Sequence, residues 1–250
     1  MAGHSKWANI KHRKAAQDAK KGKAFTKVAK ELTVAAKIGG PDPEMNPRLR
    51  VALDKAKSAN LPKDNVERAI KKGTGEGNDA IFEDVAYEGY GPGGVAILVK
   101  ALTDNKNRTV SEVSSTMGKK GGNMGEPGCV AWIFENKGII EVNKEGVNEE
   151  EFMDLVLEAG ADDFIDEGDV FQVVTEPSDY FTVKGIIEEQ EGVNMTFSEV
   201  SMKPKNTTPL SGSDLKKLFA ITEALEDLDD VQEVFSNFEA DEAAMAELDD

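Results

Sequence analysis

Apolar residues recur at helical spacing near the start of the chain. At about 100° per residue, one face of a helix over 24–38 collects Phe25, Val28, Leu32 and Ala36. Gly39-Gly40-Pro41 ends that helix, and Asn46 before Pro47 caps the next one, which ends at Asn60. A further helix begins near Pro62 and ends with Gly73 at its cap. With a charged helix over 10–20, the pattern predicts a small helical bundle.

The period changes to strand-like alternation after a polar linker over 74–79. Segments 82–90 and 95–103 flank Gly91-Pro92-Gly93-Gly94 and predict a β-hairpin. The pattern beyond it predicts a helix over 107–119, a glycine-rich loop over 118–128 and a strand from Cys129 to Glu135. Close to the C-terminus it predicts a helix over 213–228, capped by Ser213, and a strand over 231–238.

A compact pattern lies between these pieces. It predicts a strand over 138–142, a helix over 148–159, a hairpin over 162–175, a helix over 178–190 and a strand over 193–202, which is the βαββαβ order of a ferredoxin-like unit. We therefore expect an α+β protein in which a helical bundle precedes one α+β domain interrupted by a second, inserted one. The expected boundaries are 1–78 for the helical domain, 79–135 plus 205–240 for the interrupted domain, 136–204 for the inserted domain and 241–250 for an acidic tail.

Charge is divided unevenly along the chain, although the formal net charge is −17. Residues 1–75 hold 18 Lys and Arg against 7 Asp and Glu, whereas the remainder holds 12 against 40. The first thirty residues carry nine basic residues and a single acid, Asp18. Lysine-rich helices are often only solvated surface, but this density favours a basic module that binds nucleic acid, carried by an acidic body.

The lysines of the 24–38 helix lie opposite its apolar face. Lys23, Lys27, Lys30 and Lys37 fall in an arc of about 80°, a spacing suited to tracking phosphates. Trp7 has basic neighbours, and its indole either stacks on an unpaired base or packs against Phe25. The residues expected to contact nucleic acid are His4, Ser5, Lys6, Trp7, Lys11, His12, Arg13, Lys14, Lys20, Lys23, Lys27 and Lys30.

Catalytic and metal-binding groups are sparse. His4 and His12, the only histidines, lack a converging acid or cysteine, so we expect no metal site and no general base from them. Cys129, the only cysteine, has no histidine in its own domain and is expected to be a buried structural thiol. These observations predict a protein that is not an enzyme and uses no cofactor, with a hydrolase or transferase as the less favoured alternative.

The loop over 118–128 lacks the P-loop and dinucleotide-binding patterns. Its glycines permit a long turn, while Arg108, Lys119 and Lys120 are candidates for a secondary contact with RNA or a partner. The acidic residues of the body are expected to form a solvated face that repels nucleic acid from everything but the basic module. They include Asp227, Asp229, Asp230 and Glu149–Glu151.

The location is expected to be cytoplasmic. A single cysteine fits a reducing compartment, and no apolar run approaches the ~20 residues that span a bilayer. We expect no membrane partner, and a monomer is the favoured state.

Long irregular strings along nearly the whole chain resemble the YebC/PmpR family. They are Gly3-His4-Ser5-Lys6-Trp7, Gly39-Gly40-Pro41-Asp42-Pro43, Asp64-Asn65-Val66-Glu67-Arg68-Ala69-Ile70-Lys71-Lys72-Gly73, Tyr87-Glu88-Gly89-Tyr90-Gly91-Pro92-Gly93-Gly94, Thr103-Asp104-Asn105-Lys106-Asn107-Arg108-Thr109 and Gly125-Glu126-Pro127-Gly128-Cys129-Val130. The resemblance implies a cytoplasmic protein with an N-terminal helical domain and two α+β domains of ferredoxin-like kind.

The resemblance also implies a role in gene expression. Family members are described as DNA-binding transcriptional regulators, while related proteins, including a mitochondrial translational activator, act on the ribosome and are linked to translation of proline-rich stretches. The leading hypothesis is therefore a non-enzymatic regulator of gene expression that binds nucleic acid and resembles the DNA-binding transcriptional regulators of this family. The alternative is a ribosome-associated translation factor that binds ribosomal RNA, and Trp7 with its basic neighbours favours RNA. The residues alone do not decide between the two polymers.

Overall fold

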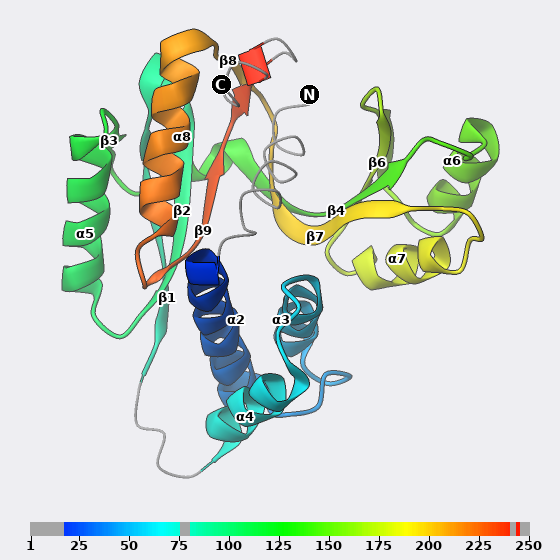
Figure 1. Cartoon of the computed structure of the whole chain (residues 1–250), viewed down its shortest axis with the longest axis horizontal. Coiled ribbons are helices and arrows are strands. Elements are labelled where there is room, and N and C mark those ends of the chain that lie inside the picture. Colours follow the sequence, from blue (N-terminus) through cyan, green and yellow to red (C-terminus); the bar gives the residue numbers. More distant parts are fainter. Residues whose placement is uncertain (1–17, 76–80, 241–243, 246–250) are drawn as a thin grey trace. The chain divides into compact units, whose positions relative to one another are not determined.

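The computed structural model describes residues 18–75, 81–240 and 244–245, with side chains from residue 22 onward. The chain divides into two compact units (Figure 1). Residues 133–207 form one, which we call the small unit. The other, the large unit, contains the N-terminal helices, the chain up to Trp132 and the chain from Thr208 onward. The fold is α+β, with helices first and two four-stranded antiparallel sheets after them.

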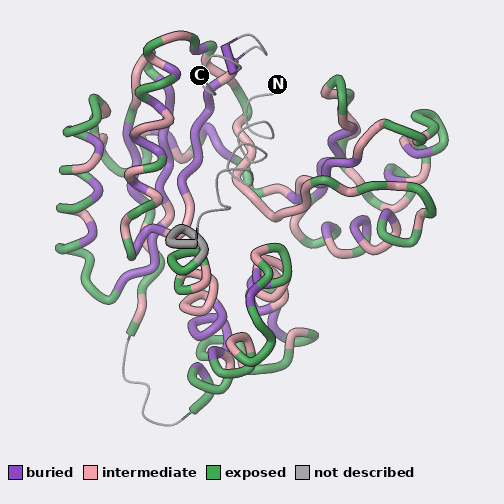
Figure 2. The backbone as a smooth tube through the Cα atoms, in the orientation of Figure 1, coloured by how far each residue is buried: buried purple, intermediate pink, exposed green. Residues whose placement is uncertain are grey.

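Three helices begin the described chain. They are α2 (Asp18–Gly39), α3 (Pro47–Ser58) and α4 (Lys63–Thr74). Their apolar faces meet in one buried core, visible as the purple segments of these helices in Figure 2 and made by Leu32, Ala35, Leu49, Ala52, Ala56, Leu61 and Ala69. The predicted bundle is confirmed for these helices. The predicted helix over 10–20 lies mostly outside the described residues, and residues 18–20 belong to α2.

One buried side chain fixes the turn between α2 and α3. The Asn46 side-chain oxygen accepts the Leu49 N–H at 3.0 Å and so caps α3, as the sequence predicts. Its amide nitrogen donates to the carbonyls of Ala35 and Gly40 at 2.8 and 2.9 Å. Gly40 has a φ of 84°, a left-handed conformation that glycine adopts without strain. Asn46 therefore satisfies the end of one helix and the start of the next.

Gly73 is not the helix cap that the sequence predicts. The helix α4 continues to Thr74, and Gly73 is buried inside it. A Cβ at Gly73 would lie 2.3 Å from the carbonyl oxygen of Thr33, so only glycine lets α2 and α4 approach this closely. At the same crossing the Thr33 hydroxyl donates to the carbonyl of Ala69 at 3.1 Å.

The sheet of the large unit has the strand order β3-β1-β2-β9. Its unit contains, in chain order, β1 (Glu83–Tyr90), the 3-10 helix η1 (Pro92–Gly94), β2 (Ala96–Thr103), α5 (Lys106–Lys119), β3 (Asn123–Met124), α8 (Gly212–Glu226) and β9 (Val231–Ser236). The predicted hairpin is confirmed, with Glu83 opposite Thr103 and Tyr90 opposite Ala96. The helix α5 packs against β1, β2 and β3, and α8 packs against β9 and α5. The central strand β2 is consequently buried along nearly its whole length.

The predicted strand from Cys129 to Glu135 is wrong in its first part. Residues Ala131–Ile133 form a short 3-10 helix, η2, and the strand begins only at Phe134. The Glu88 carboxylate of β1 accepts the backbone N–H groups of Gly128 at 2.6 Å and of Val130 and Ala131 at 2.7 Å each. Because a side chain already binds these donors, they do not enter a β-ladder.

The small unit confirms the predicted βαββαβ succession. It contains β4 (Phe134–Asn143), α6 (Glu149–Glu158), β5 (Asp163–Asp166), β6 (Val170–Thr175), α7 (Tyr180–Glu188) and β7 (Met195–Pro204). The strand order is β5-β6-β4-β7, and Phe134 at the start of β4 pairs with Pro204 at the end of β7. Phe152, Phe164 and Phe171 cluster in its core, with the rings of Phe164 and Phe171 4.9 Å apart.

The C-terminal stretch returns to the large unit. The strands β8 (Thr208–Pro209) and β10 (Phe238–Glu239) pair in parallel. Ser211, not the predicted Ser213, precedes the first residue of α8, and the Ser211 side chain makes no capping hydrogen bond. The predicted tail over 241–250 lies outside the described residues except for Ala244 and Met245, which are buried. Among the described helices, none combines the length and the apolar character needed to cross a membrane.

Candidate nucleic-acid interface

The N-terminal arm lies outside the described residues. This applies to His4, Ser5, Lys6, Trp7, Lys11, His12, Arg13 and Lys14, and the side chain of Lys20 falls outside as well, although its backbone belongs to α2. Their contact with nucleic acid stays a prediction. The described part of the predicted interface is the lysine face of α2, formed by Lys23, Lys27 and Lys30.

The lysine face of α2 meets the acidic segment that links α8 to β9. Lys23 Nζ lies 3.1 Å from the carbonyl oxygen of Asp227 and 3.2 Å from its carboxylate, and Lys27 donates to the carbonyl of Glu226. Lys30 Nζ lies 3.0 Å from the Asp230 carboxylate. The side chain of Lys23 is 50% exposed and that of Lys30 16%, so the contact changes from open to largely buried along the helix.

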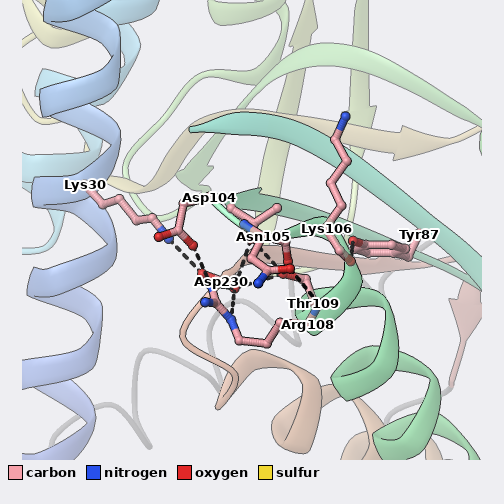
Figure 3. A network of polar contacts seen from close by, with 9 residues as sticks. Lys30, Tyr87, Asp104, Asn105, Lys106, Arg108, Thr109 and Asp230 are labelled. Carbon is pink, nitrogen blue, oxygen red and sulfur yellow. Dashed lines mark hydrogen bonds and ion pairs between the residues drawn. The ribbon is translucent and has the colours of Figure 1, made fainter. Parts of the chain in front are cut away.

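Asp230 is the centre of this contact (Figure 3). Its second carboxylate oxygen accepts from Arg108 Nη2 at 2.5 Å and from the hydroxyls of Thr109 at 2.8 Å and Thr103 at 3.1 Å. Burial alone would raise the pKa of Asp230, but the donors from Arg108, Lys30 and Thr109 outweigh it and lower the pKa to about 2. Asp230 is therefore ionised at neutral pH and joins α2, α5 and β2 through one side chain.

Local sequence explains why the donors converge. The Asn105 side chain accepts the Arg108 N–H at 3.1 Å and caps α5, while the Asn105 N–H donates to the Thr103 hydroxyl at 2.9 Å. The cap turns the first residues of α5 toward the end of β2, so that Arg108 and Thr109 face Asp230. Arg108 also pairs with Asp104 at 2.8 Å.

The expectation that Asp230 belongs to a solvated acidic face is wrong. Its side chain is only 7% exposed, whereas the neighbouring Asp229 and Asp227 are exposed. Sequence offers one weak signal, because Asp230 directly precedes Val231, the first residue of a buried strand. A residue next to an apolar strand is more often buried. The sequence alone, however, does not distinguish Asp230 from Asp227 and Asp229 in the same segment.

Further ion pairs join the helices to the rest of the large unit. Arg48 binds Glu31 of α2 at 2.7 Å and Asp84 of β1 at 2.7 Å, and Lys55 binds Glu233 of β9. Arg48 and Lys55 of the basic segment therefore pair with acids of the protein itself. The sequence pattern does not distinguish them from the cations that face solvent.

Other cations of the basic segment are exposed. Lys57 near the end of α3 and Arg68, Lys71 and Lys72 on α4 have solvent-facing side chains. They were not among the predicted contact residues. Lys57, Lys71 and Lys72 lie in the last turns of their helices, where a cation also interacts favourably with the helix dipole.

The structure does not bring Arg108 together with Lys119 and Lys120. Arg108 lies in the first turn of α5 and its guanidinium is bound to Asp104 and Asp230. Lys119 and Lys120 lie at the other end of α5, about 16 Å away along the helix axis, and are exposed. Arg108 is still 43% exposed, but its guanidinium is held by two carboxylates, whereas the exposed Lys119 and Lys120 remain the candidates for a secondary contact.

Cys129 is half-buried, not fully buried as expected, and its surroundings are those of a structural thiol. Its Sγ packs against Gly125, where an added Cβ would lie 2.6 Å away. Burial, and then the negative charge of Glu88, raise the pKa of Cys129, which disfavours the thiolate needed for nucleophilic catalysis. Across residues 22–75, 81–240 and 244–245, no group of three His, Cys, Asp or Glu side chains is placed to hold a metal ion.

Comparison with known proteins gives the family. Residues 5–76 match the TACO1/YebC protein N-terminal domain, and residues 82–238 match the TACO1/YebC second and third domain. A probable transcriptional regulatory protein of Natranaerobius thermophilus is 54% identical over 248 residues, covering 98% of this chain and 99% of that protein. A protein of the same description from Geobacter sulfurreducens is 51% identical, covering 99% of this chain and 100% of its own length.

A solved structure agrees with the sequence relatives. The crystal structure of a conserved hypothetical protein from Aquifex aeolicus superposes with a TM-score of 0.76 at 47% identity, covering 90% of this chain and 93% of that one. The relatives' descriptions support a regulator-type role. Matches over both parts of the sequence, at about half identity along nearly its full length, mean that this chain belongs to the TACO1/YebC family.

Proposed function

We propose that the protein is a non-enzymatic regulator of gene expression that binds nucleic acid through its basic N-terminal segment. The observation that carries the proposal is the division of charge: +11 over residues 1–75 against −28 over the rest, in a family whose members are described as transcriptional regulators. An acidic body repels a polyanion, so the basic segment is the favoured surface for a duplex. The proposed contacts are the twelve residues from His4 to Lys30 named above.

The described side chains refine that set. Lys23 is half exposed and its pair with Asp227 is a surface pair, which exchanges readily for a phosphate. Lys30 is largely buried against Asp230, so a phosphate contact there requires the helix to part from the acidic segment. The exposed Lys57, Arg68, Lys71 and Lys72 add cations to the same helical segment.

Duplex DNA is the proposed polymer, because the relatives are described as transcriptional regulators. Ribosomal RNA is the other outcome of the test. We also propose a division into three domains, with the βαββαβ stretch over 136–204 inserted between the parts of an α+β domain and the helical domain in front, and a cytoplasmic location.

Binding should be measured by fluorescence anisotropy with duplex DNA and with structured RNA over a range of salt concentrations. Log affinity is expected to fall with log salt by about 0.9 per phosphate neutralised on duplex DNA. Replacing Lys11, Arg13 and Lys14 by Gln should weaken binding and reduce the salt slope. The matched control is Lys216→Gln, an exposed lysine of α8 in the acidic body. Affinity that ignores salt, or that falls equally in the control, contradicts the proposal; stronger and salt-dependent binding to RNA selects the second polymer.

A further inference from the structure

Two exposed aromatic residues share one anchor point. Tyr90 at the end of β1 and Trp132 in η2 are the aromatic members of the exposed large side chains in the described part of the chain, at 39% and 63% exposed. The Tyr90 hydroxyl and the Trp132 indole N–H both donate to the carbonyl oxygen of Cys129, each at 3.1 Å. Their polar atoms therefore converge on one oxygen, while much of each side chain stays in solvent.

The anchor point is rigid. The Glu88 carboxylate accepts three backbone N–H groups from residues 128–131, and the Glu88 carbonyl accepts the Gly125 N–H at 2.8 Å. These bonds fix the backbone on both sides of Cys129. Buried aromatic side chains are held by packing, but here a hydrogen-bonded loop holds two exposed ones, which is how a binding platform is preorganised.

Two cations lie close in the chain to the short strand that pairs with Tyr90. Asn123 of β3 pairs with Tyr90, and only Gly121 and Gly122 separate Asn123 from the exposed Lys120. Figure 1 shows the end of α5, where Lys119 and Lys120 lie, beside β3. Glu126 is the one acid of residues 118–132, so this loop is locally basic in a body that is otherwise strongly acidic.

We propose that Tyr90 and Trp132, with Lys119 and Lys120, form a second nucleic-acid site that takes unpaired bases of a single strand. Aromatic rings flanked by cations bind single strands by stacking on bases while the cations neutralise phosphates. A duplex hides its base faces and offers nothing to stack on. The inference rests on the proposed function only in that the ligand is a nucleic acid, since none of these residues belongs to the basic segment.

The site can be read by fluorescence, because the chain has only two tryptophans. In a Trp7→Phe protein, Trp132 is the sole indole. Titration with a single-stranded oligouridine or oligothymidine of about 12 nucleotides should quench its emission, and a duplex of equal length should leave it unchanged. A proline-rich peptide is titrated in parallel, since aromatic pairs also bind such peptides.

Affinity is measured separately in the otherwise unaltered chain. Trp132→Ala should weaken single-strand binding by about 5- to 150-fold, corresponding to the loss of one stacked base, and change duplex binding by less than about twofold. Trp132→Phe should retain most of the affinity. The matched control is Leu157→Ala, an exposed apolar residue of α6, which should change nothing.

The possible failures are distinguishable. If the chain binds duplex through its basic segment while Trp132 emission and single-strand affinity stay unchanged, the second site is wrong and the proposed function stands. Quenching by the proline-rich peptide alone also overturns the site, in favour of peptide binding. If neither polymer binds the unaltered chain, both proposals are overturned.

Discussion

Asp230 and Glu88 are two buried carboxylates of the large unit whose negative charges are stabilised by different kinds of hydrogen-bond donor. Asp230 binds the side chains of Lys30, Arg108 and Thr109, which come from helices distant in the sequence. Glu88 binds three backbone N–H groups of a single loop, residues 128–131. In both, burial works to raise the pKa and the hydrogen bonds lower it further than burial raises it.

The difference separates two structural roles. A carboxylate bound by cations joins elements and is exchangeable, because a phosphate can compete for the same cations. A carboxylate bound by the backbone amides of one loop instead fixes the conformation of that loop. Asp230 thus belongs to the contact in which acidic residues of the large unit bind the lysines of α2. Glu88 instead anchors the loop to which the exposed Tyr90 and Trp132 side chains donate hydrogen bonds.

The largest effect is expected at Asp230. Asp230→Asn leaves Arg108 and Lys30 without their buried counter-charge, and should lower the free energy of unfolding by about 3–5 kcal/mol. Urea unfolding at neutral pH measures it. The control is Asp229→Asn, an exposed neighbour expected to change stability by less than about 0.5 kcal/mol. Equal losses in the two variants would show that Asp230 does not join the elements as described.

Glu88→Gln should cost somewhat less, about 3 kcal/mol, because the amide turns an NH2 group toward a cluster of N–H donors. The loss should be accompanied by a change in Trp132 emission in the Trp7→Phe background, since the loop that carries Trp132 loses its anchor. Glu126→Gln, an exposed acid of the same loop, serves as control. Unchanged emission in Glu88→Gln would separate the carboxylate from the aromatic pair.

The free energy of unfolding should fall at acid pH as Asp230 and Glu88 become protonated. The pKa of Asp230 falls from 3.8 to about 2 on folding, and that of Glu88 is also lowered, so their stabilisation is complete above the unfolded values and is lost as pH falls through the folded ones. For Asp230 this amounts to about 2 kcal/mol between pH 5 and pH 2. Denaturant unfolding across that range should show a smaller acid loss in Asp230→Asn than in the unaltered chain; identical losses would contradict the lowered pKa.

The smallest effect is expected at Lys23. Lys23→Gln removes a half-exposed pair and should cost less than about 1 kcal/mol, whereas Lys30→Gln, at the buried end of the same face, should cost more. If Lys23 contacts a phosphate, its replacement should also reduce the salt slope of DNA binding by about 0.9. A stability loss at Lys23 equal to that at Lys30 would remove the gradient along α2.

Local patterns were sufficient for the elements whose determinants lie close in sequence. Asn46 before Pro47 predicts the start of α3, and the glycines at 91–94 predict the hairpin, because capping and turn geometry depend on adjacent residues. The βαββαβ succession follows from alternating periods in the same way.

The errors arose where a distant group decided the outcome. Residues 129–133 carry apolar residues in a strand-like pattern, but a carboxylate some forty positions earlier binds their amides. The sequence around Gly73 is typical of a helix cap, but the glycine is required by the close approach of Thr33 in α2. For the site, the sequence identified the lysines of α2 but not their partner Asp230, and it did not single out Tyr90 and Trp132.

The chain enters and leaves the small unit through neighbouring strands, since Phe134 pairs with Pro204 and the Lys205 N–H donates to the Ile133 carbonyl at 2.8 Å. Paired residues of an antiparallel ladder lie about 5 Å apart. A gene could therefore gain, lose or exchange the intervening segment at these two points while a short turn rejoined the remaining ends. Adjacent entry and exit points are what the proposed inserted domain requires, because an insertion must begin and end at neighbouring points of its host.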